Sequence, residues 1–303
     1  MAAISFGALL AWLATPHFTV ALTHSLLFSA LYVGSIYLLT ALRASSLSNN
    51  AAPAVSIHDR DHPQVIKQRT LGALLATMLC LGIAGVQLRA WQVDAVRSMG
   101  LGYAQVAGSV VVAMVLCCVI YLGPLMLDYL DAAAQGRGAI SWKRLWALVS
   151  RDLWSSPQLL RNYVVGPVTE ELVFRTCVVS LWAVSPGVST NKTVFLSPLV
   201  FGIAHVHHAW AHRQSSGVWL RTLFQIAYTT VFGWFAASLF IKTGSVAGPV
   251  CAHVFCNIMG VPDLGRIGEY MGWRRVAVWA VFLCGLLGFI ALYEPMTRKG
   301  VFV

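Results

Sequence analysis

The chain has 303 residues, of which 58% are hydrophobic and only 11% are charged. Soluble domains are about one quarter charged, so this composition excludes an ordinary soluble protein and indicates one built for lipid. The net charge of +10 does not indicate nucleic-acid binding, because the basic residues are dispersed among the polar stretches that separate apolar ones.

Apolar stretches with few or no charges recur along the whole chain. Each approaches the roughly 20 residues that a helix needs to cross the hydrocarbon core, although the seventh is short. They predict an all-α, polytopic integral membrane protein with about eight transmembrane helices, forming a single membrane-embedded domain over 1–303. The stretches are 18–41, 70–88, 104–127, 162–184, 194–210, 222–241, 246–262 and 276–293.

The distribution of Lys and Arg predicts how the chain crosses the membrane. Fourteen of these residues follow the first, third, fifth and seventh apolar stretches, and six lie in the other loops and the tails. Cytosolic loops of membrane proteins are enriched in positive charge. We therefore expect the odd-numbered loops in the cytosol and both termini on the opposite side.

The fourth apolar stretch contains two adjacent acids, Glu170 and Glu171, followed by Arg175. A charged side chain at the bilayer centre costs about 2.5–3.5 kcal/mol on insertion scales, so chains keep such groups for chemistry, ion transport or packing. Glu171 and Arg175 are four residues apart and can form an ion pair along one helix. An ion pair that only stabilises the helix remains open as an interpretation. Glu170 points about 100° away and can serve another purpose.

Two later stretches also carry polar side chains. His205 lies in the fifth, whose histidine-rich end includes His208, and His253 and Asn257 lie four residues apart in the seventh. With a rise of about 1.5 Å per residue, Glu170 lies roughly 12 Å, His205 and Asn257 roughly 8 Å and His253 roughly 14 Å from the cytosolic helix ends. Polar residues of three helices are thus predicted at one level. His208 is expected nearer the interface.

Residue types in this set suit hydrolysis. A carboxylate and an imidazole that meet in an apolar cavity can activate water as a general base. An amide and an imidazole N–H can stabilise the oxyanion that forms during acyl transfer. The residues therefore predict an intramembrane active site that hydrolyses an amide or ester.

At these residues the chain resembles the type II CAAX prenyl endopeptidases, the Ras-converting enzymes of the wider ABI membrane-protease group. The family pattern is E-E-x-x-x-R, then F-x-x-x-H, then H-x-x-x-N/D. Here it reads Glu170-Glu171-LVF-Arg175, Phe201-GIA-His205 and His253-VFC-Asn257, within the helices of about 160–262. The surrounding TEELVFR, FGIAHVHH and RDHP (60–63) resemble the eukaryotic branch.

The resemblance implies an endopeptidase that removes the C-terminal aaX tripeptide from farnesylated or geranylgeranylated CAAX proteins, such as small GTPases of the Ras type. It implies a multi-pass protein of the endoplasmic reticulum membrane with its active site open to the cytosol. Glu170 and His205 would activate the water, and His253 and Asn257 would stabilise the oxyanion. The supporting residues would be Glu171, Arg175, Phe201 and His208.

Membrane lipid and prenylated CAAX proteins are the expected partners, and no nucleic acid and no cofactor are expected. We favour a metal-free mechanism because the sequence has no HExxH and Asn257 is a poor zinc ligand. Glu170, His205 and His253 can in principle hold zinc, so a zinc-dependent intramembrane metalloprotease is the alternative. A non-enzymatic scaffold or transporter is less favoured, since transporters often have related halves and this sequence shows none.

Overall fold

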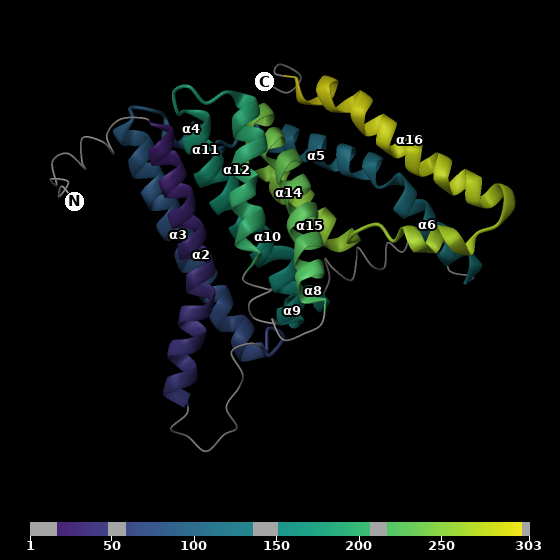
Figure 1. The fold of residues 1–303 in the computed structure, drawn as a ribbon, viewed down its shortest axis with the longest axis horizontal. Coiled ribbons are helices and arrows are strands. Elements are labelled where there is room, and N and C mark those ends of the chain that lie inside the picture. The colour runs from purple at the N-terminus through teal and green to yellow at the C-terminus, as the bar shows by residue number, and fades with distance from the viewer. Residues whose placement is uncertain (1–16, 48–58, 136–150, 207–216, 299–303) are drawn as a thin grey trace. The chain divides into compact units, whose positions relative to one another are not determined.

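The computed structural model describes residues 17–47, 59–135, 151–206 and 217–298. Within these ranges every regular element is helical and no β-strand is present, which confirms the all-α class for the described part of the chain (Figure 1). The elements are α2 (Phe18–Leu47), α3 (Pro63–Ala90), α4 (Ala95–Ser98), α5 (Val106–Ile120), α6 (Leu122–Ala134), α8 (Arg151–Ser155), α9 (Pro157–Leu160), η1 (Arg161–Val165), α10 (Gly166–Glu171), η2 (Leu172–Val179), α11 (Ser180–Ala183), α12 (Thr190–Ala204), α14 (Val218–Thr243), α15 (Ala247–Met259), η3 (Leu264–Glu269) and α16 (Gly272–Thr297).

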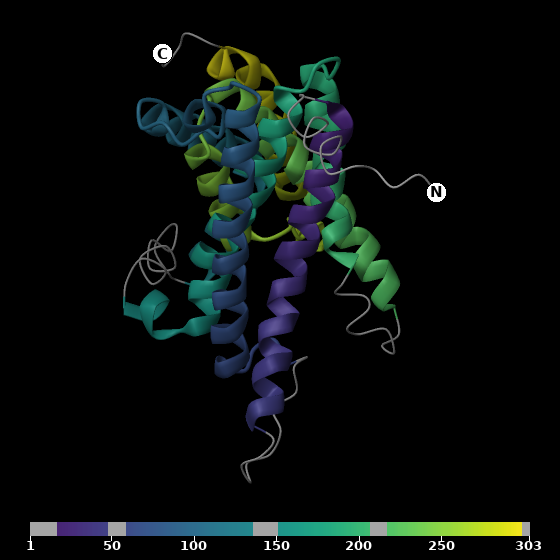
Figure 2. The same ribbon diagram turned by 90° about the vertical axis from the view of Figure 1, so that its left-hand side faces the viewer.

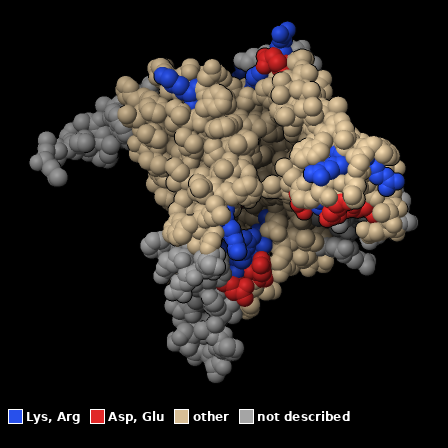
Figure 3. All heavy atoms as spheres, turned by 45° about the vertical axis from the view of Figure 1, so that its right-hand side comes forward, with Lys and Arg blue, Asp and Glu red and all other residues tan. Residues whose placement is uncertain are grey.

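Four of the described helices are long and apolar enough to cross a membrane. They are α2 over Phe18–Leu42, α3, α14 and α16, and the pair formed by α5 and α6 adds a fifth if it is one span. Figure 3 shows a face on which most side chains are uncharged and the Lys, Arg, Asp and Glu side chains gather in a few groups. The chain is a multi-pass membrane protein.

The expected count of eight spans is not confirmed. The stretch predicted at 162–184 is divided into short α-helical and π-helical segments, and those at 194–210 and 246–262 yield described helices of only 15 and 13 residues. The stretch at 104–127 is not straight either, because α5 and α6 meet at 64°. Pro124 lies in the first turn of α6 and has no N–H to offer the carbonyl of Ile120, which favours a break there.

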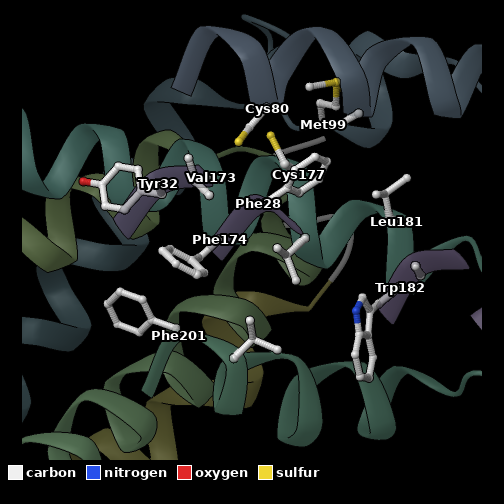
Figure 4. Close-up of a cluster of buried hydrophobic side chains, with 14 of the residues drawn as sticks. Phe28, Tyr32, Cys80, Met99, Val173, Phe174, Cys177, Leu181, Trp182 and Phe201 are labelled. Atoms are coloured by element: carbon white, nitrogen blue, oxygen red, sulfur yellow. The ribbon is translucent and has the colours of Figure 1, made fainter. Parts of the chain in front are cut away.

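The helices form two compact units, of which the first comprises Met1–Tyr103 and Val168–Val246. In it α2 and α3 run side by side (Figures 1 and 2) and both contact η2, which also contacts α12 and α14. Buried apolar side chains from these helices fill the space between them (Figure 4). They include Phe28, Tyr32, Cys80, Val173, Phe174, Cys177, Leu181, Trp182 and Phe201.

The second unit comprises Ala104–Pro167 and Ala247–Val303. In it α5 packs against both α15 and α16. A polar network before α16 joins the η3 segment to α6: the Arg266 guanidinium binds the carboxylates of Asp128, at 3.0 Å, and Asp131. The Tyr270 hydroxyl donates to Asp131 Oδ1 over 3.2 Å.

Candidate active site

The helical segment that carries the two glutamates is irregular on both sides of them. A π-helical turn, η1, precedes α10, and a longer π-helical stretch, η2, follows it. Pro167 lacks the N–H of a regular helical turn, which gives a physical reason for the change of hydrogen bonding before α10. The apolar stretch at 162–184 predicts a regular α-helix, so these π-helical segments are a difference from the expectation. Interruptions of this kind occur frequently at functional sites.

Glu171 and Arg175 form the ion pair that their spacing predicts. The distance from Arg175 Nε to Glu171 Oε2 is 3.1 Å, and the two side chains are 1% and 0% exposed. Ions removed this completely from solvent are expensive unless other groups replace the lost water. Nη1 and Nη2 of Arg175 find no hydrogen-bond acceptor among the described residues. The guanidinium instead lies over the rings of Phe201 and Phe232, 4.7 and 5.5 Å from their centroids.

Glu170 differs from its neighbour because its side chain is partly accessible, whereas Glu171 is fully buried. This difference agrees with the angle of about 100° between consecutive residues of a helix. The Glu170 carboxyl group interacts electrostatically with Arg175, with Tyr32 of α2 and with Tyr228 of α14. Glu170 is therefore the acid of this pair that is better placed to meet a substrate or a water molecule.

His205 ends α12 and is anchored by its own helix. Its Nδ1 lies 2.9 Å from the carbonyl oxygen of Phe201. A carbonyl oxygen only accepts, so Nδ1 must donate, which makes Nε2 the unprotonated nitrogen of the neutral ring. His24 makes the same contact with Val20 within α2, so this bond by itself does not define a functional histidine. What distinguishes His205 is its neighbours.

Phe201 connects the first two motifs. Its ring packs edge-on against the His205 imidazole, at 90° and with 4.9 Å between the centroids. The guanidinium carbon of Arg175 lies over the same ring, 4.7 Å from its centroid. Gly233 of α14 allows the helices to approach, since a Cβ there would lie 2.6 Å from Cβ of Pro198. The E-E-x-x-x-R and F-x-x-x-H segments thus belong to one packed arrangement in the first unit.

His253 and Asn257 lie on α15 in the second unit. His253 is buried, and the Asn257 side-chain amide donates to the backbone carbonyl of Asn162 over 2.9 Å. An amide nitrogen carries two hydrogens, so this bond orients the group and leaves a second hydrogen that can serve as a donor. Asn162 belongs to η1, in the same helical segment of the chain that continues into α10 and Glu170.

Two contacts with α5 fix α15 near its ends. The N–H of Gly248 donates to Ser109 Oγ over 2.9 Å, and the Tyr121 hydroxyl donates to the carbonyl of Gly260 over 3.0 Å. The Tyr121 ring also packs edge-on against Phe255, with 5.3 Å between centroids. Gly248 is required for the close approach, because a Cβ there would lie 2.8 Å from the backbone oxygen of Ser109.

The structure therefore places Glu170, Glu171, Arg175, Phe201 and His205 in the first unit, and His253 and Asn257 in the second. The expectation that all of them meet at one level stays a prediction. His208 lies outside the described residues. Among the described residues, no group of three His, Cys, Asp or Glu side chains is placed to hold a metal ion.

Three residues that contact the site were not singled out from the sequence. Tyr32 and Thr169 are bonded to each other next to Glu170, and the Asn162 carbonyl holds Asn257. Thr169 stands beside the two glutamates, which is the one signal that pointed to it. Tyr32 and Asn162 are distant in sequence from their partners, and no spacing rule relates them.

Each unit holds polar groups that are suited to one part of a hydrolysis reaction. The first holds a carboxyl group and an imidazole with a defined tautomer, which can accept a proton from water. The second holds an imidazole and an amide that can donate to a developing negative charge. Such groups on apolar helices are typical of a membrane-embedded hydrolase.

Comparisons with known proteins identify the family of hydrolases that this chain resembles. A family model described as "Type II CAAX prenyl endopeptidase Rce1-like" matches residues 152–259. The human protein named CAAX prenyl protease 2 is 35% identical over 253 residues, which are 78% of this chain and 74% of the human one. The chain belongs to this endopeptidase family.

Relatives from a fungus and a plant are similar as well. The probable CAAX prenyl protease 2 of Schizosaccharomyces pombe is 31% identical over 255 residues, covering 81% of this chain and 83% of its own. The CAAX prenyl protease 2 of Arabidopsis thaliana is 40% identical over 149 residues, covering 48% and 46%. No solved structure matches the chain significantly.

Proposed function

We propose that this endopeptidase removes the aaX tripeptide from proteins whose CAAX cysteine has been prenylated. Relatives over most of the chain that are named CAAX prenyl proteases support the substrate class. The observation that carries the mechanism is the shared contact on Phe201, which brings Arg175 and the ordered imidazole of His205 together in the unit that also holds the partly accessible Glu170.

In the proposed reaction Glu170 and His205 take a proton from a water molecule, whose oxygen attacks the carbonyl carbon of the bond after the prenylated cysteine. His253 and Asn257 donate hydrogen bonds to the resulting oxyanion. The tetrahedral intermediate then collapses, the C–N bond breaks, and the proton held by the acid–base pair passes to the leaving amine. The products are the shortened protein with a free carboxylate and the aaX tripeptide.

Glu171 and Arg175 have a supporting role in this proposal. Their ion pair is buried, and it anchors the residue that directly follows Glu170 in the chain. Phe201 contacts both Arg175 and His205 and would hold the imidazole in place. His208 is proposed to assist from the following segment. Support of this kind matters because a misplacement of about 1 Å can cost about a hundredfold in rate.

The cellular setting is proposed from the same reasoning. Farnesylated and geranylgeranylated proteins of the Ras type are cytosolic, so the site is expected to open to the cytosol from the endoplasmic reticulum membrane. The prenyl group and surrounding lipid would share the apolar surface of the spanning helices. The distribution of Lys and Arg supports this orientation.

A direct test assays purified protein on a farnesylated CAAX peptide in detergent, in the presence of excess chelator. Wild type, Glu170→Gln and His205→Ala are compared with Glu269→Gln, in which an exposed acid outside the site is replaced. Tripeptide release by wild type and Glu269→Gln, and by neither of the others, is the expected result. Full activity of Glu170→Gln would contradict the mechanism.

The metal content of the same samples separates the two enzyme hypotheses. Activity that persists in chelator-washed protein without zinc supports the metal-free mechanism. Activity that disappears with the metal and returns on zinc addition would favour the metalloprotease, with Glu170, His205 and His253 as ligands. No release by wild type under either condition would favour a non-enzymatic role.

A further inference from the structure

Tyr32, on the first described helix, reaches the residue that directly precedes Glu170. Its hydroxyl lies 2.7 Å from Oγ1 of Thr169, and the two residues are 6% and 1% exposed. They are 137 positions apart in sequence, so the bond joins α2 to α10 within the first unit. Tyr32 lies outside every motif named above, whereas Thr169 begins the TEELVFR segment.

The ring of Tyr32 is fixed as well. It packs edge-on against Phe174, with 6.1 Å between centroids, and Phe174 packs against Phe201 at 4.9 Å. Figure 4 shows these three rings along one side of the buried cluster, with the Tyr32 hydroxyl pointing away from the cluster. The series continues to His205 through Phe201. The hydroxyl of Tyr32 is thus bonded to the residue next to Glu170, and its ring begins the aromatic series that ends at His205.

A hydroxyl buried in an apolar helix costs free energy unless it is bonded, and phenylalanine would fill the same space without that cost. Bonds between helices in membranes can also serve packing alone, with an average contribution of about 0.6 kcal/mol. The position of this bond distinguishes the two roles. It holds the neighbour of Glu170 on one side, while the ion pair with Arg175 holds Glu171 on the other side.

We propose that Tyr32 is a positioning residue for Glu170, acting through Thr169. Consecutive helical side chains point about 100° apart, so fixing Thr169 and Glu171 fixes the direction in which the side chain between them leaves the helix. Tyr32 and Glu170 also interact electrostatically. This inference rests on the proposed role of Glu170 as part of the general base.

Steady-state kinetics on the farnesylated peptide tests this role. Tyr32→Phe removes the hydroxyl but keeps the ring, and Thr169→Val removes its partner at nearly the same volume. Each is expected to lower kcat about tenfold at unchanged KM, the size expected when one hydrogen bond no longer supports the transition state. The double variant is expected to lose no more than either single variant, because both remove the same bond.

Two controls separate positioning from general damage. Thr169→Ser keeps a hydroxyl and is expected to retain wild-type kcat. Tyr37→Phe removes a hydroxyl from the same helix, where the ring lies against Arg69, and is expected to leave kcat unchanged. Thermal unfolding in detergent gives the folded fraction of each variant, so that kcat refers to folded protein.

Several outcomes would overturn the inference. They are wild-type kcat in Tyr32→Phe, additive losses in the double variant, or losses explained by the folded fraction alone. If Tyr32→Phe does not fold, the comparison of Thr169→Val with Thr169→Ser decides. Glu170→Ala measured in parallel keeps the two proposals apart. An active Glu170→Ala refutes the proposed mechanism, whereas an inactive one beside a normal Tyr32→Phe refutes only the positioning role.

Discussion

Arg175 and Phe201 form a cation–π contact in which the guanidinium carbon lies 4.7 Å from the ring centroid. The two residues come from different motifs. The His205 imidazole packs edge-on against the same Phe201 ring. A buried cation and a proposed acid–base residue therefore share one aromatic neighbour. Stability and activity are expected to respond together to changes at this ring.

Replacing Arg175 by methionine is expected to destabilise the protein by about 3–5 kcal/mol, because Glu171 would remain buried without its counter-charge. Adding Glu171→Gln is expected to recover part of the loss. Denaturant unfolding in detergent micelles measures both effects. Arg97→Met removes an exposed arginine and should change little. Equal stability of the Arg175 single variant and wild type would contradict the importance of the pair.

Phe201→Leu is expected to lower kcat at least tenfold and to reduce stability by about 1–2 kcal/mol, since a desolvated cation–π contact is worth up to about 2 kcal/mol. Leucine keeps most of the apolar volume but offers no ring to Arg175 or His205. Phe195→Leu on the same helix α12 is the matched control, because Phe195 is 52% exposed. Equal kinetics of the two variants would show that the Phe201 ring has no special role.

Gly248→Ala is expected to displace α15 from α5, because the new Cβ would lie 2.8 Å from the backbone oxygen of Ser109. Overpacking of this kind costs about 1–3 kcal/mol and would shift the helix that carries His253. Reduced kcat and a lower unfolding temperature are the expected readouts. Gly82→Ala adds the same methyl group to α3, where nothing lies within 4 Å, and should be neutral. A fully active, stable Gly248→Ala would refute the tight contact.

Asn257→Ala is expected to reduce kcat by about 10²–10³ with little change in KM, as for loss of one oxyanion donor. The matched control is Asn162→Ala. Asn162 receives the amide of Asn257 through its backbone carbonyl, which alanine retains. Similar losses in both variants would indicate that the side chain of Asn162 matters and that the oxyanion assignment needs revision.

The polar network before α16 predicts that the stability of the protein depends on alkaline pH. Burial, followed by the hydrogen bond to Asp131, raises the pKa of Tyr270 above its ordinary value of 10.0. A raised folded-state pKa means that the contribution to stability is complete below the unfolded pKa of 10.0 and is lost as the pH rises through the folded one.

Wild type and Tyr270→Phe are therefore expected to show a constant difference in unfolding temperature between pH 7 and 9. The difference should shrink above about pH 10. Thermal unfolding across this range measures it. A difference that stays constant to strongly alkaline pH would contradict the role of the phenol proton. Arg266 is not expected to titrate here, because although burial opposes its charge, Asp128 and Asp131 raise its pKa.

The local features of the site could be predicted from the sequence alone. The spacing of four residues predicted the pair of Glu171 and Arg175, and composition predicted the apolar helices. Both are properties of neighbours along one helix. The break before Pro124 and the π-helical turns around α10 depend on which backbone hydrogen bonds the helix loses. Hydropathy carries no information about these bonds.

Contacts between segments that are distant in the chain could not be predicted from the sequence. Nothing about Tyr32 distinguishes it from a tyrosine at a membrane interface until its partner Thr169 is seen. Asn162 takes part through its backbone, so its side-chain identity held no information. Spacing rules work within a helix, whereas these pairs depend on how separate helices pack.

The rings that cover Arg175 have a consequence for biosynthesis. Phe201 and Phe232 both follow Arg175 in the chain, on α12 and α14. A nascent chain that ends before residue 232 therefore contains the ion pair of Glu171 and Arg175 without its second aromatic neighbour. The pair is fully covered only after α14 has been synthesised. Truncations before Phe232 are accordingly expected to expose the ion pair of Glu171 and Arg175 to lipid.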